Sequence, residues 1–303
     1  MKEDIRQKFI ELLGKERVLF DEPMSNHTTF RIGGPADIFT MPEDKQQIAD
    51  VVKLCKNEQI PFFVLGNGSN LLVSDKGYRG VIIQMDRNMS EITVEGKQIR
   101  ACAGALLSSV AVAAKNASLT GFEFAGGIPG TLGGAVVMNA GAYGGEMKDV
   151  LKEAVVLTGE GEILTIPVEE LEMGYRTSII KTSGYLVLEA VISLEEGDQE
   201  EIRSRMKELS DRRTEKQPLD FPSAGSTFKR PEGYFAGKLI MDSGLRGCRI
   251  GGAQVSEKHC GFVINAGGAT AKDVRALMDH VIHTVHEKFG VTLEPEVKFL
   301  GEF

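Results

Sequence analysis

The spacing of hydrophobic residues along the chain predicts both helices and strands. Apolar side chains three or four positions apart are typical of a helix with one buried face, whereas short alternating or continuous apolar runs are typical of strands. Helical spacing occurs at residues 5–13, 42–55, 106–114, 195–216 and 270–289. Strand-like runs occur at residues 62–65, 71–73, 81–83, 91–94, 98–101, 154–158, 162–166, 185–193 and 291–300.

The last predicted helix carries clear end signals. Thr270 and Asp273 have the spacing of a capping box, and Gly290 is placed to end the helix. Its expected buried residues are Val274, Leu277, Met278, Val281, Val285 and Phe289. We expect the strand at 291–300 to be interrupted by Pro295, because proline lacks the amide that a sheet requires.

The helix at residues 195–216 is mostly charged, with eight acidic and six basic residues. We expect it to be largely solvated and to mark a domain boundary. Just before the strands at 154–166, residues 121–145 contain nine glycines in 25 positions. Apolar residues such as Leu132 and Val136 lie between these glycines, whereas flexible linkers combine glycine with polar residues. We therefore expect an ordered, buried loop there, followed by a hairpin across Gly159-Glu160-Gly161.

Length and charge exclude several classes of protein. The chain of 303 residues predicts about two domains, at roughly 150 residues per domain. No apolar run reaches the roughly 18 residues of a membrane span, and the first residues do not resemble a signal peptide, so we expect a cytoplasmic protein. A net charge of −8 disfavours nucleic acid as a partner. The four cysteines lack metal or redox spacing and are expected to be reduced.

Two glycine clusters are candidates for phosphate binding. The turn Gly66-Asn67-Gly68-Ser69-Asn70-Leu71 begins like a dinucleotide fingerprint, but Leu71 stands where a third small residue belongs. A Rossmann site is therefore disfavoured, and a plain turn stays an alternative. The second cluster runs from Gly126 to Gly134. Backbone without Cβ atoms can approach a ligand closely, and consecutive amides can bind a pyrophosphate.

Other candidate residues have ordinary explanations when taken one at a time. His280, His283 and His286 fan out over the polar face of the last helix, so we expect exposed side chains and no metal site. The pair Glu294 and Glu296 has the composition of surface charge. Arg176 is either a surface residue or a bidentate carboxylate ligand. Ser226 lacks the G-x-S-x-G elbow of serine hydrolases, because Phe228 replaces the second glycine.

Taken together and in order, these segments resemble the UDP-N-acetylenolpyruvoylglucosamine reductase (MurB) family of peptidoglycan synthesis. The resemblance covers most of the chain and rests on residues 26–34, 65–72, 125–145, 175–176, 224–229 and 293–297. It implies an α+β protein with a two-lobed, PCMH-type FAD-binding domain, as in vanillyl-alcohol-oxidase-like enzymes, followed by a smaller substrate-binding domain. The implied boundaries are 1–25 for a lead-in, 26–196 for the FAD domain with lobes 26–85 and 86–196, and 197–303 for the second domain.

The resemblance implies that FAD contacts both glycine clusters. The cofactor contacts it implies are Gly66, Asn67, Gly68, Ser69, Asn70, Leu71, Gly126, Gly127, Ile128, Pro129, Gly130, Thr131, Gly133, Gly134, Asn139 and Gly141. Relatives that hold FAD covalently use His or Cys near the cofactor. Neither residue occurs at positions 61–75 or 121–145, so we expect dissociable FAD, with His27 and Cys102 the nearest residues in sequence that could form a link.

The activity that the resemblance implies is a hydride relay. NADPH reduces FAD, hydride passes to C3 of the enolpyruvyl group of UDP-N-acetylglucosamine-enolpyruvate, and a proton added at C2 gives UDP-N-acetylmuramate. Arg176, Ser226 and Glu296 match the family's catalytic residues, with Ser226 as the proton donor to C2. Arg176 and Glu296 match its carboxylate-side residues, and Glu296 would need to be protonated or to share a proton there. We add that the charge of Lys229 could ease proton loss from Ser226.

Substrate contacts are implied less fully. Lys216 matches a diphosphate-side lysine, whereas Arg230 replaces an asparagine of the enterobacterial form; Tyr175 and Lys229 complete the predicted substrate residues. The stretch after Arg176 has no room for the extra tyrosine-bearing loop, so the chain resembles the shorter variety. The expected oligomeric state is a monomer or weak homo-oligomer. Two alternatives stay open: an oxygen-using oxidase on the same scaffold, and a flavin- or UDP-sugar-binding regulator without turnover.

Overall fold

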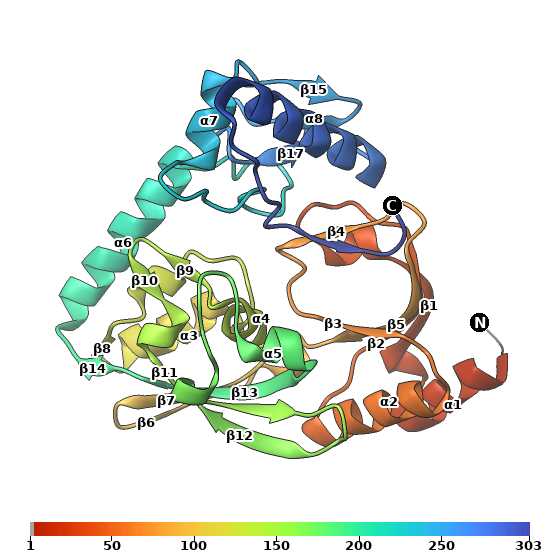
Figure 1. Ribbon diagram of the computed structural model, residues 1–303. Coiled ribbons are helices and arrows are strands. Elements are labelled where there is room, and N and C mark those ends of the chain that lie inside the picture. Colours follow the sequence, from red (N-terminus) through yellow and green to blue (C-terminus); the bar gives the residue numbers. More distant parts are fainter. Residues whose placement is uncertain (1–2) are drawn as a thin grey trace. The chain divides into compact units, whose positions relative to one another are not determined.

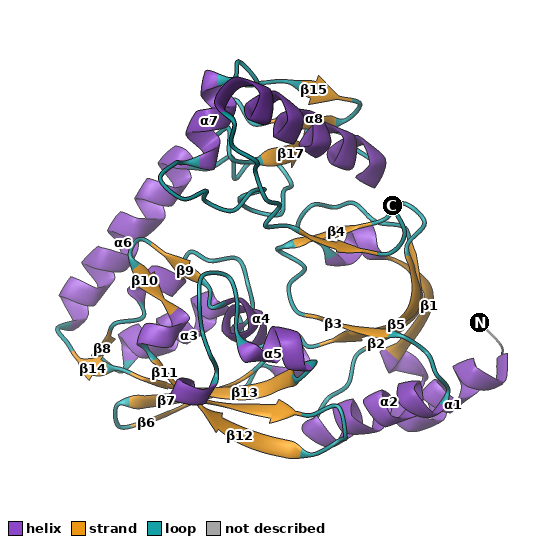
Figure 2. Ribbon diagram, viewed as in Figure 1, coloured by secondary structure: helices purple, strands orange, loops and turns teal. Residues whose placement is uncertain are grey.

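The computed structural model describes residues 3–303, which divide into two units, each built from three separate segments. The first unit contains residues up to Leu19, Ile38–Asn67 and Val81–Arg213, and the second contains Phe20–Asp37, Gly68–Gly80 and Thr214–Phe303. Helices and strands are mixed throughout the chain (Figure 2), as expected for the α+β class. Among the described residues, no helix is both long and apolar enough to cross a bilayer.

The first unit is built on a five-stranded antiparallel sheet in the order β12-β11-β13-β7-β6. Its strands are β6 (Ile92–Glu95), β7 (Gln98–Cys102), β11 (Leu151–Leu157), β12 (Ile163–Pro167) and β13 (Leu186–Ser193). The central strand β13 is buried from Leu186 to Ile192 because α4 (Leu132–Met138) packs on it, and α3 (Leu107–Asn116) packs beside it on β6 and β7 (Figure 1). The hairpin expected across residues 159–161 joins β11 to β12 and is confirmed.

Shorter elements complete the first unit. Helix α1 (Glu3–Leu13) packs against α2 (Lys45–Asn57), whose N-cap Asp44 accepts a hydrogen bond from the Gln47 amide. Strand β3 (Phe62–Leu65) pairs in parallel with residues 81–84 of β5 (Tyr78–Gln84), which lies in a sheet of order β1-β2-β5-β3. Other elements of this unit are β8 (Leu119–Thr120), β9 (Gly141–Ala142), β10 (Gly145–Glu146), α5 (Ile179–Ser183), β14 (Glu195–Glu196) and most of α6 (Gln199–Lys216). Strands β1 (Val18–Pro23) and β2 (Pro35–Thr40) each contain residues of both units.

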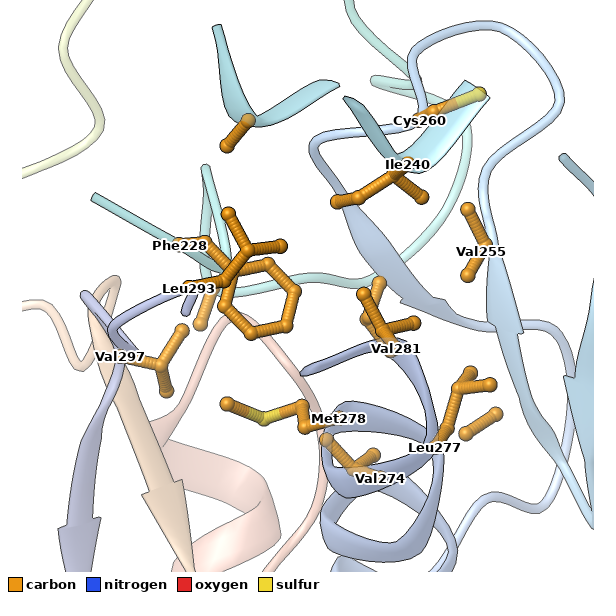
Figure 3. Close-up of a cluster of buried hydrophobic side chains, with 14 of the residues drawn as sticks. Phe228, Ile240, Val255, Cys260, Val274, Leu277, Met278, Val281, Leu293 and Val297 are labelled. Atoms are coloured by element: carbon orange, nitrogen blue, oxygen red, sulfur yellow. The ribbon is translucent and has the colours of Figure 1, made fainter. Parts of the chain in front are cut away.

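The second unit has a hydrophobic core formed by residues that are far apart in sequence. Phe30, Ile32 and Leu72 pack with apolar residues from positions 224–297. Figure 3 shows part of this cluster, with Phe228, Met278 and Leu293 among the labelled side chains. Its elements are α7 (Ala236–Asp242), α8 (Ala271–Phe289), a sheet of β15 (Arg249–Ile250), β16 (Ala253–Val255) and β17 (Val263–Asn265), and a parallel pair of β18 (Lys298–Leu300) with β4 (Leu71–Val73). This shared core explains why the unit is discontinuous, unlike the contiguous domains that we expected.

Helix α8 follows the sequence pattern closely. Both hydrogen bonds of the Thr270–Asp273 capping box form, and Gly290 ends the helix in a left-handed conformation. The prediction that Phe289 is buried is wrong: its side chain is 40% exposed, because it lies one turn beyond the buried stripe that ends at Val285. The strand expected over residues 291–300 is reduced to β18, since Pro295 takes part only in an isolated bridge with Phe228.

The glycine-rich stretch is more regular than expected. Residues 121–145 were predicted as a buried loop, yet they contain α4 and the short strands β9 and β10. Position 133, inside α4, requires glycine, because a Cβ atom there would approach Ala103 Cβ at 2.8 Å. Glycine at this position therefore allows close packing of the helix, and this tertiary contact outweighs the low helix propensity of glycine.

Candidate functional site

The two glycine clusters meet within the first unit. A Cβ atom at Gly66 would clash with the Thr131 hydroxyl, and the Asn67 side-chain amide donates a 2.8 Å hydrogen bond to the Pro129 carbonyl oxygen. Gly126, Gly127, Ile128 and Gly130 are partly exposed beside this contact. Segments that are 62 residues apart in sequence thus present bare backbone at one place, which is what close approach of a phosphate-containing ligand requires.

Residues 68–71, the rest of the first glycine cluster, lie in the second unit beside the predicted catalytic Glu296. Asn70 Nδ2 donates to the Glu296 carbonyl oxygen at 3.3 Å, and the Lys298 amide donates to the Asn70 carbonyl oxygen at 3.0 Å. Gly68 has a φ of 59°, and a Cβ atom there would clash with the His27 carbonyl oxygen. Any other residue at position 68 would therefore be strained in two ways.

A short antiparallel bridge brings the segment of Ser226 next to that of Glu296. The Glu296 amide donates to the Thr227 carbonyl oxygen at 2.8 Å, and Phe228 pairs with Pro295. Thr227 is buried, and its hydroxyl accepts a hydrogen bond from the Val263 amide. These contacts fix the backbone on the C-terminal side of Ser226, whose own side chain is exposed, while Glu296 is half-buried.

Lys229 and Glu294 form an ion pair at the same bridge. Lys229 Nζ lies 2.8 Å from Glu294 Oε2, and the hydrogen bond and charge of Lys229 lower the pKa of Glu294. The two acids around Pro295 thus differ: Glu294 is exposed and paired with a lysine, and Glu296 is half-buried. The charge that we assigned to assist Ser226 is partly neutralised by Glu294.

Arg176 lies in a tight turn of the first unit. The Gly174 amide donates to the Thr177 carbonyl oxygen at 3.0 Å and the Thr177 amide returns a bond of 3.3 Å, so Tyr175 and Arg176 form the tip. Arg176 has a φ of 57°, a conformation that costs an L-residue about 1–2 kcal/mol. Its guanidinium stacks over the Tyr175 ring at 5.1 Å and reaches the Gly141 carbonyl oxygen at 3.5 Å. Strain of this kind is concentrated at functional positions.

Two of the predicted cofactor contacts have structural roles in this fold. Asn139 is completely buried in a left-handed conformation at the end of α4, and its amide group is bonded within the protein. Contact with a cofactor would require that side chain to leave its partners. Gly133 is also buried, and its amide donates to the Ala103 carbonyl oxygen at 2.8 Å. Their contacts with FAD stay predictions.

The predicted substrate residues are accessible. Tyr175, Lys216 and Arg230 are exposed, and Arg230 stacks over the Phe235 ring at 4.1 Å. Lys216 is the last residue of α6. Residues 177–194 form α5 and β13 with short connections, so no inserted loop follows Arg176.

Arg213 is a candidate that the sequence analysis missed. Burial lowers the pKa of its guanidinium, and its Cδ would lie 3.2 Å from a Cβ atom at Gly127. The arginine stem therefore packs on the glycine cluster. The sequence pattern places Arg213 among the solvated charges of its helix. The one feature that could have singled it out is its position three residues before Lys216, a predicted substrate residue.

The histidines of α8 are exposed, as expected, and His283 pairs with Glu287 at 3.2 Å. Over residues 3–303, no group of three or more His, Cys, Asp or Glu side chains is arranged to hold a metal ion.

Comparison with known proteins identifies both halves of the chain. Residues 36–167 match the family described as "FAD binding domain", and residues 217–300 match "UDP-N-acetylenolpyruvoylglucosamine reductase, C-terminal domain". The UDP-N-acetylenolpyruvoylglucosamine reductase of Lachnoclostridium phytofermentans is 56% identical over 98% of this chain and 97% of its own length. This chain belongs to the UDP-N-acetylenolpyruvoylglucosamine reductase family.

Two other reductases of this family are also similar to the chain over nearly its whole length. The reductase of Clostridioides difficile is 53% identical over 99% of both chains. The crystal structure of the Thermus caldophilus reductase (MurB) is 35% identical and superposes with a TM-score of 0.81 over 94% of this chain and 98% of that chain. The resemblance drawn from the sequence is therefore confirmed, as are the oxidoreductase class and the α+β fold. The oxidase and regulator alternatives are set aside.

FAD is the cofactor of this reductase family, and the residues of this chain fit it. The contact between residues 66–67 and 129–131 creates a surface of bare backbone on which a side chain at Gly66 could not be accommodated. Amides and glycines in such an arrangement suit a diphosphate. Cys102 is half-buried, and burial raises the pKa of its thiol, which disfavours the thiolate that a covalent flavin link would need.

Proposed function

We propose that the chain catalyses the NADPH-dependent reduction of UDP-N-acetylglucosamine-enolpyruvate to UDP-N-acetylmuramate, a step of peptidoglycan synthesis. Full-length identity of more than 50% to reductases with this name carries the proposal. When bound, FAD supplies hydride chemistry. The residues of the chain supply binding of the substrate carboxylate, charge stabilisation and a proton.

Arg176 is proposed to bind the substrate carboxylate through its planar guanidinium. Reduction at C3 places negative charge on C2 and on the adjoining carboxylate, so a fixed cation there stabilises the transition state more than the ground state. The strained conformation of Arg176 supports this role, because such strain persists when a side chain must point in one direction. Glu296 is proposed to act on the carboxylate side of the same reaction, as its match to the family implies.

Ser226 is proposed as the proton donor to C2. Its backbone is held by the bridge to residues 294–296, and its hydroxyl is exposed to a ligand. A serine hydroxyl is a weak acid, but a carbanion-like carbon is a strong base, so position within hydrogen-bond reach governs the transfer.

The test separates the two half-reactions. In Ser226→Ala, NADPH should reduce bound flavin at nearly the wild-type rate, whereas oxidation of the reduced flavin by UDP-N-acetylglucosamine-enolpyruvate should slow by about 10²–10⁴-fold, the usual contribution of a general acid. Stopped-flow absorbance of the flavin measures both rates. Ser226→Cys is the matched control, since it retains a donor of similar size. Equal loss of both half-reactions in Ser226→Ala would overturn the assignment.

Cytoplasmic localisation and a monomeric or weakly associated state are part of the same proposal. A nucleotide-linked substrate and NADPH are both cytoplasmic metabolites, which supports the first. Sedimentation of the purified protein over a range of concentrations would test the second, and a stable tetramer would contradict it.

A further inference from the structure

The turn that carries Arg176 is tied to the rest of the first unit at its first residue. The Gly174 carbonyl oxygen accepts two hydrogen bonds, one from the Thr177 amide within the turn and one of 3.1 Å from Asn139 Nδ2. A second tie lies on the far side of the turn, where the Ser178 hydroxyl donates to the Val137 carbonyl oxygen at 2.8 Å. The end of α4 therefore contacts the turn on both sides of Arg176.

Asn139 is oriented by its remaining contacts. Nδ2 also donates to Glu146 Oε2 at 2.8 Å, and Oδ1 accepts from the Lys148 amide at 3.0 Å. Both donors and the oxygen of this fully buried amide are thus used, and the assignment of Nδ2 and Oδ1 is fixed by their partners. Glu146 is itself held in a capping box with Asp149.

We infer that Asn139 is a positioning residue that sets the direction of Arg176 by holding the Gly174 carbonyl oxygen. This inference rests on the proposed role of Arg176 as the carboxylate ligand. A left-handed arginine needs restraint from its surroundings, because relaxation to negative φ would turn the side chain away. The buried hydrogen bonds at Gly174 and Val137 supply that restraint.

A pair of substitutions separates positioning from folding. Asn139→Asp keeps the shape but removes both donors and places two carboxylates together, so it should destabilise the protein. Adding Glu146→Gln restores the hydrogen bond between positions 139 and 146, because the new amide nitrogen at position 146 can donate to the new carboxylate at position 139. The side-chain oxygen at position 146 can still accept the hydrogen bond of the capping box. No donor from position 139 then reaches the Gly174 carbonyl oxygen. Glu146→Gln alone is the matched control.

The double variant should be more stable than Asn139→Asp but less stable than Glu146→Gln, because a carboxylate oxygen at position 139 then faces the Gly174 carbonyl oxygen with no donor between them. It should keep the flavin content of Glu146→Gln. NADPH should reduce its flavin at the control rate. Oxidation of the reduced flavin by UDP-N-acetylglucosamine-enolpyruvate should remain slower by about 10- to 100-fold, with a raised half-saturating concentration of substrate, as expected when a ligand-binding side chain is displaced. Asn139→Gly, which also accepts a left-handed φ, should show the same split.

Three results would overturn the inference. In the first, the rate of substrate-driven flavin oxidation recovers together with stability in the double variant. In the second, the double variant and Asn139→Gly lose the two half-reactions equally. Either result would indicate a purely structural role for Asn139. Loss of flavin with stability retained would instead support direct contact of Asn139 with the cofactor. Arg176→Ala, measured in parallel, distinguishes these outcomes from failure of the proposed function: if this variant oxidises normally with substrate, then the role assigned to Arg176 is wrong.

Discussion

Arg176 combines a functional side chain with an unfavourable backbone conformation. Its φ of 57° suits glycine better than arginine, and the guanidinium is held over Tyr175 and near the Gly141 carbonyl oxygen. Selection for stability alone would favour glycine here. The residue is therefore expected to show opposite effects on stability and activity.

We predict that Arg176→Gly and Arg176→Ala are equally impaired with the enolpyruvyl substrate but differ in stability. The glycine variant should have a free energy of unfolding about 1 kcal/mol higher than the alanine variant, because only alanine is strained by the left-handed conformation. Chemical denaturation of the two proteins measures the difference. Identical stabilities would show that position 176 is unstrained.

His259 gives a second residue-scale prediction, in pH dependence. Burial lowers its pKa, and its Nδ1 accepts a hydrogen bond from the Gly261 amide at 3.1 Å, so the folded state favours the neutral ring. The unfolded state then binds more protons. The stabilising contribution is complete above the unfolded pKa of about 6.5 and is lost as the pH falls from there through the lower folded pKa.

His259→Asn preserves an acceptor for Gly261 but does not titrate. Between pH 7.5 and pH 5.5, the unfolding free energy of the wild type should fall more steeply than that of this variant. Urea denaturation at the two pH values tests the difference, and parallel slopes would contradict it.

At the scale of elements, α8 has a cap that its own sequence does not contain. Both oxygens of the Asp75 carboxylate accept hydrogen bonds from the first turn, from the Ala271 amide at 2.8 Å and the Lys272 amide at 3.0 Å. Asp75 therefore ties the segment after β4 to the N-terminus of α8, where negative charge is also favoured by the helix dipole.

Asp75→Ala should lower the free energy of unfolding by about 1–2 kcal/mol, the range for loss of a strong N-cap. Amide hydrogen exchange should increase in α8. The matched control is Asp44→Ala, which removes the N-cap of α2 and should increase exchange there instead. Unchanged exchange in α8 of the Asp75 variant would show that the capping box alone holds the helix end.

Local patterns predicted elements well and long-range contacts poorly. Residues Ile48, Val51, Val52 and Cys55 form the buried face of α2 as their spacing predicts, and the capping box of α8 forms from neighbours in sequence. Helix α4 was missed because glycine disfavours helices, whereas Gly133 is required by Ala103, 30 residues away. Pattern analysis could not show Asp75 as a cap or Asn139 as a support, since both depend on tertiary contacts.

In the candidate site, too, sequence motifs identified residues, whereas contacts between distant residues became visible only in the structure. The glycine clusters and Arg176, Ser226 and Glu296 were named from motif order, and the structure shows the clusters in contact through Asn67 and Thr131. Arg213 and the ion pair of Lys229 with Glu294 were not predicted. A charged residue in a helix gives no sign of its partner until the fold is known.

At the scale of the whole molecule, FAD is expected to stabilise the protein by mass action and to leave it on denaturation. Free FAD at about 100 times its dissociation constant should add roughly 2.7 kcal/mol to the unfolding free energy. Acid precipitation followed by centrifugation should leave the yellow colour in the supernatant. Colour in the pellet would indicate a covalent bond, with His27 and Cys102 as the first residues to replace.

The pairing of β18 with β4 has a consequence for synthesis on the ribosome. Residues 298–300 hydrogen-bond in register with residues 71–73, and the core of the second unit joins Phe30 and Leu72 to residues beyond 224. The first unit has all its segments once residue 213 has emerged, but the second must wait for nearly the last codon. Until then the apolar side chains at positions 30, 32 and 72 lack their partners, so stalled translation between codons 214 and 297 should yield nascent chains that depend on chaperones.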